Sequence, residues 1–238
     1  MNHRRVGGVL GGLGPLATAY FLQRIVLATD AQTDQEHIDL IITQRSSTPD
    51  RTAAIQGKGP SPKESLNRDI SLLVDAGADF ITAPCNSSMV FLTDAEQSHG
   101  VPFLSIIDET VKAARVRYPQ ASTLALLATE GTIASGLYRE AAEKYSFELI
   151  EPDRVEQQQV TDIIYRQVKA NQPINEEQFF SLCDTLTARR AEVIITGCTE
   201  LSVAVEQLGD RGRPIVDSLA SLAEATILEA GGKVLATD

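Results

Sequence analysis

The chain has 238 residues, 43% of them hydrophobic, and a formal net charge of −11. This length and composition can build the core of one large domain or two smaller ones. Because affinity for nucleic acid depends on Lys and Arg neutralising phosphates, the acidic balance argues against a nucleic-acid partner. The sequence has neither a run of about 20 apolar residues nor a signal-peptide start, so we expect a cytoplasmic protein without a membrane partner.

The first half alternates short apolar runs with helical patterns, which is typical of βαβ units around a parallel sheet. Strands are predicted at 6–12, 38–43 and 79–84. Helices are predicted at 15–28 and 62–77, and Gly77 is the expected C-terminal cap of the second. Another helix-length segment follows residue 84.

The second half repeats this scheme. Strands are predicted at 123–129, 147–152 and 192–196, followed by the apolar segment 213–220. One helix is expected to begin near Ser135, and a long helix is expected to run through Val160, Ile163, Ile164 and Val168. The two halves therefore have the same predicted architecture.

An internal repeat relates Cys85 to Cys198. The segments GADFITAPCNSS and RRAEVIITGCTEL share an acidic residue, an apolar run and a cysteine, and the two cysteines are 113 positions apart (198 minus 85). Asp108 and Asp217 are 109 positions apart (217 minus 108). We infer two equivalent α/β lobes, each with a cysteine at the carboxyl end of a strand, where open α/β sheets bind ligands.

Two thiols facing one cleft could act as an acid/base pair. One would remove a proton from a substrate carbon and the other would return a proton on the opposite face, with the sulfurs roughly 7 Å apart. A helix N-terminus after each cysteine would lower the thiol pKa from about 8.5 toward neutrality. The alternative is that both cysteines are small buried core residues, which is the reading we favour for Cys183 in its helical pattern.

Polar residues after each cysteine could hold a substrate carboxylate. The candidates are Asn86, Ser87, Ser88 and Thr199, and plain helix capping is an equally good reading of them. Arg51, in the long loop 46–62, could clamp a carboxylate, although a loop Arg is commonly only solvated. Lys169 would by composition alone be a surface residue.

The sequence contains little that indicates a cofactor-binding or metal-binding site. Gly12 to Ala17 fits the loose dinucleotide pattern G-x-G-x-x-A, but Pro15 removes one N–H from the phosphate cradle. No phosphate-binding loop and no motif for a pyridoxal phosphate lysine occur. Three scattered histidines and the absence of a CxxC pair argue against a structural metal. We therefore expect chemistry without a cofactor or metal.

Several motifs, spread over the whole chain, match a known family. They are GGLGPLAT at 11–18, DQEH at 34–37, PDRTA at 49–53, GKG at 57–59, PCN at 84–86, GTIASGLY at 131–138 and GCTE at 197–200. On these residues the chain resembles the cofactor-independent aspartate/glutamate racemases, and most closely the aspartate racemases. The resemblance implies two similar Rossmann-like α/β domains with parallel sheets, related by pseudo-twofold symmetry, and an active site in the cleft between them.

The resemblance also implies roles and boundaries. Cys85 and Cys198 would be the catalytic acid/base pair, serving the D and the L enantiomer respectively. The first domain would comprise 1–110 with the C-terminal helix 217–238, the second would comprise 111–216, and the protein would be a homodimer. The candidate substrate-binding residues are Arg51 and Lys169 for the side-chain carboxylate, Asn86 and Thr199 for the α-carboxylate and amino group, Glu200 for the ammonium or the thiol, and Ser87, Ser88 and Gly12.

The chain departs from the aspartate racemase pattern at Met89, where those enzymes usually have His. Ser87 keeps a hydroxyl, but Met89 can neither titrate nor donate a hydrogen bond. The leading function is racemisation of aspartate, with glutamate as a further substrate. The alternatives are a related cysteine-dependent isomerase of hydantoins or maleate, and a weakened protein that only binds an acidic amino acid.

Overall fold

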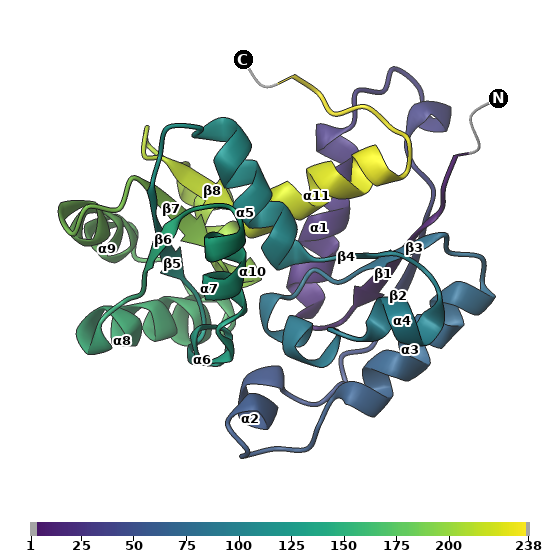
Figure 1. Ribbon diagram of the computed structural model, residues 1–238, viewed down its shortest axis with the longest axis horizontal. Coiled ribbons are helices and arrows are strands. Elements are labelled where there is room, and N and C mark those ends of the chain that lie inside the picture. Colours follow the sequence, from purple (N-terminus) through teal and green to yellow (C-terminus); the bar gives the residue numbers. More distant parts are fainter. Residues whose placement is uncertain (1–3, 237–238) are drawn as a thin grey trace. The chain divides into compact units, whose positions relative to one another are not determined.

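The first half of the chain folds around a parallel sheet in the computed structural model, which describes residues 4–236 (Figure 1). The strand order is β2-β1-β3-β4, and all neighbouring strands are parallel. The strands are β1 (Gly7–Gly11), β2 (Leu40–Gln44), β3 (Phe80–Thr82) and β4 (Phe103–Leu104). The helices of this half are α1 (Pro15–Ala28), η1 (Asp34–Glu36), α2 (Arg51–Ile55), α3 (Lys63–Asp75), η2 (Asn86–Phe91) and α4 (Ala95–His99).

The second half folds around another parallel sheet with the corresponding order β6-β5-β7-β8. The strands are β5 (Thr123–Leu127), β6 (Glu148–Ile150), β7 (Val193–Thr196) and β8 (Ile215–Asp217). The helices are α5 (Ile106–Arg117), α6 (Glu130–Ser135), α7 (Leu137–Lys144), α8 (Arg154–Asp162), η3 (Ile163–Val168), α9 (Glu176–Ala188) and α10 (Thr199–Leu208), and α11 (Ser218–Glu229) follows β8. The predicted fold class, two similar α/β halves with parallel sheets, is confirmed.

Contacts divide the described chain into two units, each with its own core. One unit comprises the residues up to Ile106 and those from Leu219 onward, and the other comprises Ile107–Ser218. In the first, β1 and β3 are fully buried strands, and α3 packs against β1 and β2. In the second, β7 is fully buried, and α9 and α10 both pack against it. Buried apolar strands of this kind are expected in parallel sheets covered by helices.

Local signals account for several element boundaries. Pro15 lies in the first turn of α1, where its missing N–H costs no hydrogen bond. Gly77 follows α3 with φ of +98°, a left-handed conformation that favours glycine. Asp153 caps α8 in a reciprocal capping box with Glu156. The predictions of a helix at 15–28 and of a glycine stop after α3 are confirmed.

Three predicted helices differ in the structure. The segment after Cys85 forms the 3-10 helix η2 and the short α4 rather than one long helix. The helix expected near Ser135 is two helices, because Gly136 adopts a left-handed conformation (φ +74°) between α6 and α7. The long helix through Val160 changes at Ile163 from α-helical to π-helical geometry in η3.

Threonines mark equivalent positions in the two sheets. Thr82 ends β3 and donates to the carbonyl of Leu104 on β4 (3.3 Å), while Thr196 ends β7 and donates to the Asp217 carboxylate on β8 (2.8 Å). Leu104 therefore corresponds to Asp217. The expected match of Asp108 with Asp217 is wrong, because Asp108 lies in the first turn of α5, beyond the strand. Only the repeat around the cysteines locates the equivalent strands.

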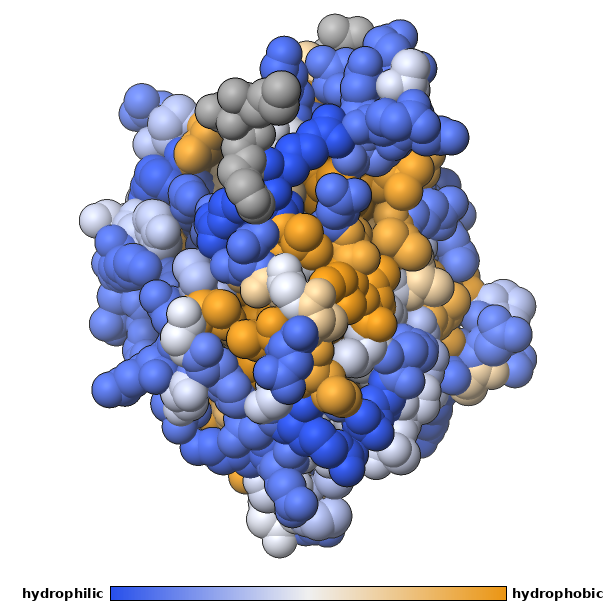
Figure 2. Space-filling view, turned by 90° about the vertical axis from the view of Figure 1, so that its right-hand side faces the viewer, coloured by the Kyte–Doolittle hydropathy of each residue, from blue (hydrophilic) through white to orange (hydrophobic). Residues whose placement is uncertain are grey.

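The surface carries both hydrophobic and hydrophilic residues. Figure 2 shows one face on which hydrophobic residues gather inside a hydrophilic border. Within residues 4–236, no helix combines the length and the apolar character that crossing a membrane requires.

Candidate functional site

Cys85 lies where β3 ends and η2 begins. Its backbone is extended (φ −160°, ψ 110°), it occupies the N-cap position of η2, and only 5% of the residue is exposed. Its sulfur lies 3.6 Å from the hydroxyl oxygen of Ser87. The structure therefore places this thiol at the carboxyl edge of the sheet, beside a hydroxyl that can exchange a hydrogen bond with it.

The other residues after Cys85 are held tightly. The Ser88 hydroxyl donates to the carbonyl of Cys85 (2.8 Å) and is completely buried, so it supports the turn rather than presenting its hydroxyl to a ligand. Asn86 is buried as well. Met89 is only 6% exposed and belongs to the apolar core of this unit, so the residue that replaces the usual His is a packing residue here.

Arg51 is the first residue of α2, which packs against η2. Its guanidinium donates to the carbonyls of Leu13 (2.5 Å), Pro49 (3.0 Å) and Thr48 (3.3 Å). Among residues 4–236, no carboxylate pairs with it, and its buried Nε has no hydrogen-bond partner. A buried donor on an unneutralised cation is costly unless an anion joins it, so Arg51 is suited to receive a carboxylate.

Gly12, at the end of β1, has a structural explanation. Its φ is +85°, and a Cβ there would lie 2.4 Å from the backbone nitrogen of Arg45. Its own N–H donates to the hydroxyl of Thr18 (2.9 Å). Close backbone approach therefore requires glycine at this position, and the N–H is already used within the protein.

Cys198 occupies the equivalent place in the second half. It follows β7, has an extended backbone (φ −148°, ψ 132°), forms the N-cap of α10 and is 7% exposed. Neither Cys198 nor Cys85 caps its helix with a side-chain hydrogen bond. Both sulfurs are thus left available for other chemistry at matching positions of the two sheets.

Acidic and basic partners surround Cys198. Its thiol donates to Oε2 of Glu200 (3.0 Å), and the other oxygen of Glu200 pairs with Nζ of Lys169 (2.8 Å). Thr199 is buried, with its hydroxyl 3.5 Å from the same Glu200 oxygen. Lys169 directly follows the π-helix η3, which packs against α10. The structure brings Cys198, Glu200 and Lys169 together as one connected group.

The predicted lowering of the thiol pKa is wrong for Cys198. Burial raises its pKa well above the ordinary value, and the negative charge and hydrogen bond of Glu200 raise it further. The positive charge of Lys169 lowers the pKa of Cys198, but by less than burial and Glu200 raise it. Cys198 is therefore held as the protonated thiol, which suits a proton donor.

Two residues near Cys198 were not singled out from the sequence. Gly197 packs so closely that a Cβ would lie 2.6 Å from Cδ1 of Leu126 and 3.0 Å from Cε2 of Tyr138. Tyr138 is completely buried, and that burial raises its pKa. Gly197 lies in the motif GCTE and Tyr138 in the motif GTIASGLY. The motifs therefore contained both residues, although the sequence alone did not indicate what either residue does.

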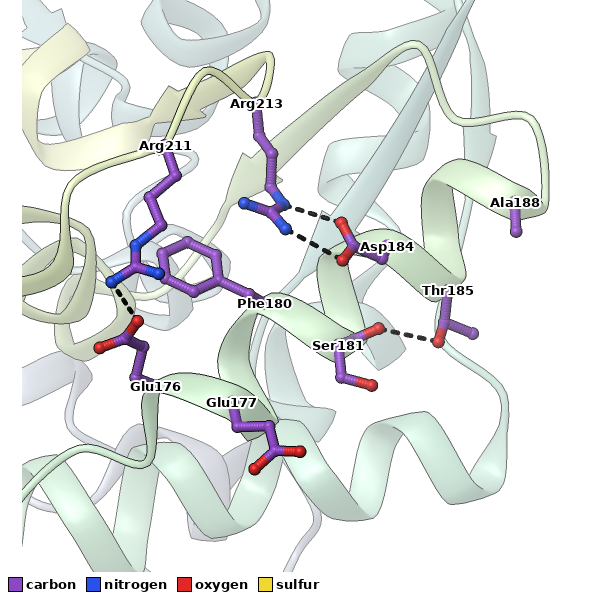
Figure 3. Close-up of a pocket in the computed structure, with 9 residues that line it drawn as sticks. All are labelled: Glu176, Glu177, Phe180, Ser181, Asp184, Thr185, Ala188, Arg211 and Arg213. Carbon is purple, nitrogen blue, oxygen red and sulfur yellow. Dashed lines mark hydrogen bonds and ion pairs between the residues drawn. The ribbon is translucent and has the colours of Figure 1, made fainter.

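A surface cavity of about 750 Å³ lies apart from these residues (Figure 3). In it the ring of Phe180 lies between Arg211 and Arg213, which pair with Glu176 and Asp184 respectively. Both arginines that line the cavity are therefore already paired with a carboxylate. Across residues 4–236, no cluster of three or more His, Cys, Asp or Glu has the arrangement of a metal site.

Comparison with known proteins identifies the family. Residues 10–226 match the family Asp/Glu/Hydantoin racemase. The chain belongs to this family. The match covers the strands from β2 to β8 and both cysteines, so the racemase family fold extends over both halves of the chain.

Individual racemases resemble the chain over nearly its whole length. The broad specificity amino-acid racemase RacX of Bacillus subtilis (strain 168) is 28% identical over 229 residues, which cover 92% of this chain and 96% of RacX. The structure of aspartate racemase from Picrophilus torridus superposes with a TM-score of 0.82 at 28% identity, covering 97% and 96% of the two chains. Glutamate racemase from Francisella tularensis shares the fold, with a TM-score of 0.62 at 17% identity, over 97% of this chain and 83% of that one.

Proposed function

We propose that this racemase interconverts L- and D-aspartate without a cofactor, using Cys85 and Cys198 as the two acid/base groups. The observation that carries the proposal is the equivalence of the two cysteines. Each follows the third strand of its half, has an extended backbone, and begins a helix without capping it. Two independent structural cysteines have no reason to share all three properties.

The proposed reaction needs two proton transfers. Sγ of Cys85 takes the Cα proton of one enantiomer, so that an S–H bond forms and the electron pair of the broken C–H bond stays on the substrate. Cys198 then gives its thiol proton to the opposite face, which forms the new C–H bond and leaves a thiolate on Cys198. The reverse sequence converts the other enantiomer. This scheme requires both sulfurs to reach one substrate carbon.

An acidic substrate is supported by Arg51. Its guanidinium has three carbonyl partners but no carboxylate, and its buried Nε has no partner among residues 4–236. A substrate side-chain carboxylate would supply both the missing charge and the missing acceptor. We propose that Asn86, Ser87 and Thr199 contact the α-carboxylate and amino group.

A second candidate is a racemase of broader specificity. The relative from Bacillus subtilis carries that description, and it is as similar in sequence to this chain as the aspartate racemase is. Lys169, the other expected ligand of the substrate carboxylate, is already paired with Glu200. Recognition of an acidic side chain would then depend mainly on Arg51.

Solvent exchange tests the proposal. L- and D-aspartate are incubated with the protein in D₂O, and loss of the Cα–H signal is followed by NMR alongside chiral chromatography of the products. We expect exchange at Cα together with formation of the opposite enantiomer. Neutral amino acids assayed in parallel separate the two candidates. Exchange no faster than in the protein-free control, with every amino acid tried, would refute racemase activity.

We further propose a cytoplasmic homodimer, with domains at 1–110 plus 217–238 and at 111–216. Exposed apolar residues on α1 support the dimer: Leu16 is 56% exposed, Val26 47% and Leu27 59%. A helix that shows this much apolar surface to solvent commonly contacts another molecule. In a homodimer the same apolar surface of α1 on a second copy of the chain would cover these residues. Such a contact between apolar surfaces needs no complementary charges.

A further inference from the structure

The second half of the proposed site contains an internal ion pair that reaches the thiol. Nζ of Lys169 lies 2.8 Å from one oxygen of Glu200, and the other oxygen accepts the thiol hydrogen bond of Cys198 at 3.0 Å. The Glu200 side chain is 12% exposed and Cys198 only 7%, so water screens these interactions weakly. The three groups therefore act on one another electrostatically.

We propose that Glu200 and Lys169 are positioning residues that set which cysteine carries the proton in the free protein. Glu200 holds the proton on Cys198 by accepting its hydrogen bond and by repelling a thiolate. Lys169 holds the Glu200 carboxylate in place through their ion pair, and its positive charge at the same time moderates the repulsion. This inference rests on the proposed two-cysteine function.

The local fold supports a positioning role for Lys169. It is the residue after η3, a rare π-helical turn of a kind frequently found at functional sites. Gln167 within η3 is buried, donates to Asp162 (3.0 Å) and Gln178 (2.7 Å), and accepts from the backbone of Asn175 (2.8 Å). These bonds fix the turn from which Lys169 extends to Glu200.

Two other ionisable groups of the second half, Tyr138 and Asp217, do not take over the effect of Glu200 and Lys169 on the Cys198 thiol. Within the second half, Tyr138 also lies near Cys198, but its buried hydroxyl stays neutral because burial raises its pKa. Asp217 accepts a hydrogen bond from Thr196, at the end of β7 (2.8 Å). Glu200 and Lys169 are therefore the groups whose charges act directly on the thiol, with opposite signs.

The opposite signs give a test that needs no substrate. The pH dependence of Cys198 alkylation by iodoacetamide is measured by mass spectrometry in the full-length protein. Glu200→Gln removes the repelling charge, and we expect its midpoint to fall by about one pH unit or more. Lys169→Met removes the moderating charge, and its midpoint should rise. Glu206→Gln makes the same chemical change at an exposed site on α10 and should leave the midpoint unchanged.

General loosening cannot produce this pattern, because it would make Cys198 more reactive in both variants. Alkylation of the fully buried Cys183 reports loosening directly and should stay equally slow in all four proteins. A midpoint that does not fall in Glu200→Gln, or that moves the same way in both variants, would overturn the inference. Because no substrate is present, this result is independent of whether the protein racemises aspartate.

A second measurement links the charge pair to turnover. Because the equilibrium constant between two enantiomers is one, kcat/KM must be equal in the two directions. A proton held on Cys198 in the free protein can therefore make the two directions differ in kcat and in KM, but not in their ratio. We expect the KM values of the two enantiomers to differ in the wild-type protein and to converge in Glu200→Gln. An unchanged KM ratio in that variant would contradict the proposal even if racemisation itself were established.

Discussion

Gly197 lies directly against the ring of Tyr138, so that a Cβ on Gly197 would come within 3.0 Å of Cε2. The same Cβ would lie 2.6 Å from Cδ1 of Leu126. The backbone just before Cys198 therefore rests on a completely buried tyrosine without an intervening side chain. This contact sets how deeply the thiol lies in the second half, and it explains why the residue before Cys198 is glycine.

Gly197→Ala should destabilise the protein and displace Cys198. Inserting a methyl group into this packed core should lower the free energy of unfolding by about 1–3 kcal/mol. Urea denaturation measures the change. Leu126→Val removes the Cδ1 atom that the new methyl would strike, so the double variant should recover part of the loss. Equal stability of Gly197→Ala and wild type would show that the loop moves without cost.

Replacement of either Cys85 or Cys198 by serine should abolish racemisation. Because each thiol is proposed to serve one face of Cα, we expect Cys85→Ser and Cys198→Ser each to lose a factor of about 10²–10⁴ or more in rate. Chiral chromatography measures racemisation. Cys183→Ser, in which the third cysteine is replaced within α9, controls for loss of a thiol in general. Full activity in either of the first two variants would exclude the two-cysteine mechanism.

Arg51→Met should weaken binding of aspartate more than that of neutral amino acids. The variant loses the cation that no carboxylate neutralises among residues 4–236, so KM for aspartate should rise at least about tenfold. Lys58→Met makes a similar change at an exposed lysine of the same loop and should have little effect. A proportional rise of KM for aspartate and alanine would show that Arg51 stabilises the loop instead of selecting the substrate.

The fold was largely predictable because the signals are local and repeated. Alternating apolar runs located the strands, and the motifs around Cys85 and Cys198 located equivalent sheet edges. The match of Asp108 with Asp217 failed because β8 ends at Asp217, whereas β4 already ends at Leu104 and Asp108 lies in α5, a difference that residue spacing alone does not show.

The electrostatics of the site were not predictable from residue order. A helix N-terminus after Cys198 suggested a lowered thiol pKa, but burial and Glu200 outweigh it. Lys169 and Glu200 are 31 positions apart (200 minus 169), and only the packing of η3 against α10 brings them together. Such contacts depend on tertiary structure.

Leu22→Glu combined with Val26→Glu should prevent dimer formation. Leu22 and Val26 are one helical turn apart on α1 and are 40% and 47% exposed, so carboxylates there would face each other across a twofold interface. Light scattering after size-exclusion chromatography gives the mass. Leu72→Glu, on an equally exposed leucine of α3, is the control and should leave a dimer intact. A wild-type protein that is monomeric at all concentrations would contradict the proposed dimer.

Cys183 should make the folded state sensitive to alkaline pH. Burial raises its pKa from 9.0 to about 12; the positive charge of Arg213 lowers the pKa by a smaller amount, and the negative charge of Asp184 adds a smaller rise. Since the folded-state pKa is the higher one, the stability that the neutral thiol contributes is complete below about pH 9. It should be lost as pH rises toward 12, by about 1.4 kcal/mol per pH unit.

Cys183→Ala isolates this effect. The variant should be less stable than wild type at neutral pH because it leaves a small cavity, but it should lose less stability between pH 9 and the highest pH at which the wild type still unfolds reversibly. Urea titrations of both proteins across this range give the difference in free energy of unfolding. That difference should shrink steadily with pH. A constant difference would mean that Cys183 does not ionise on unfolding in this range, and that other groups govern the alkaline loss of stability.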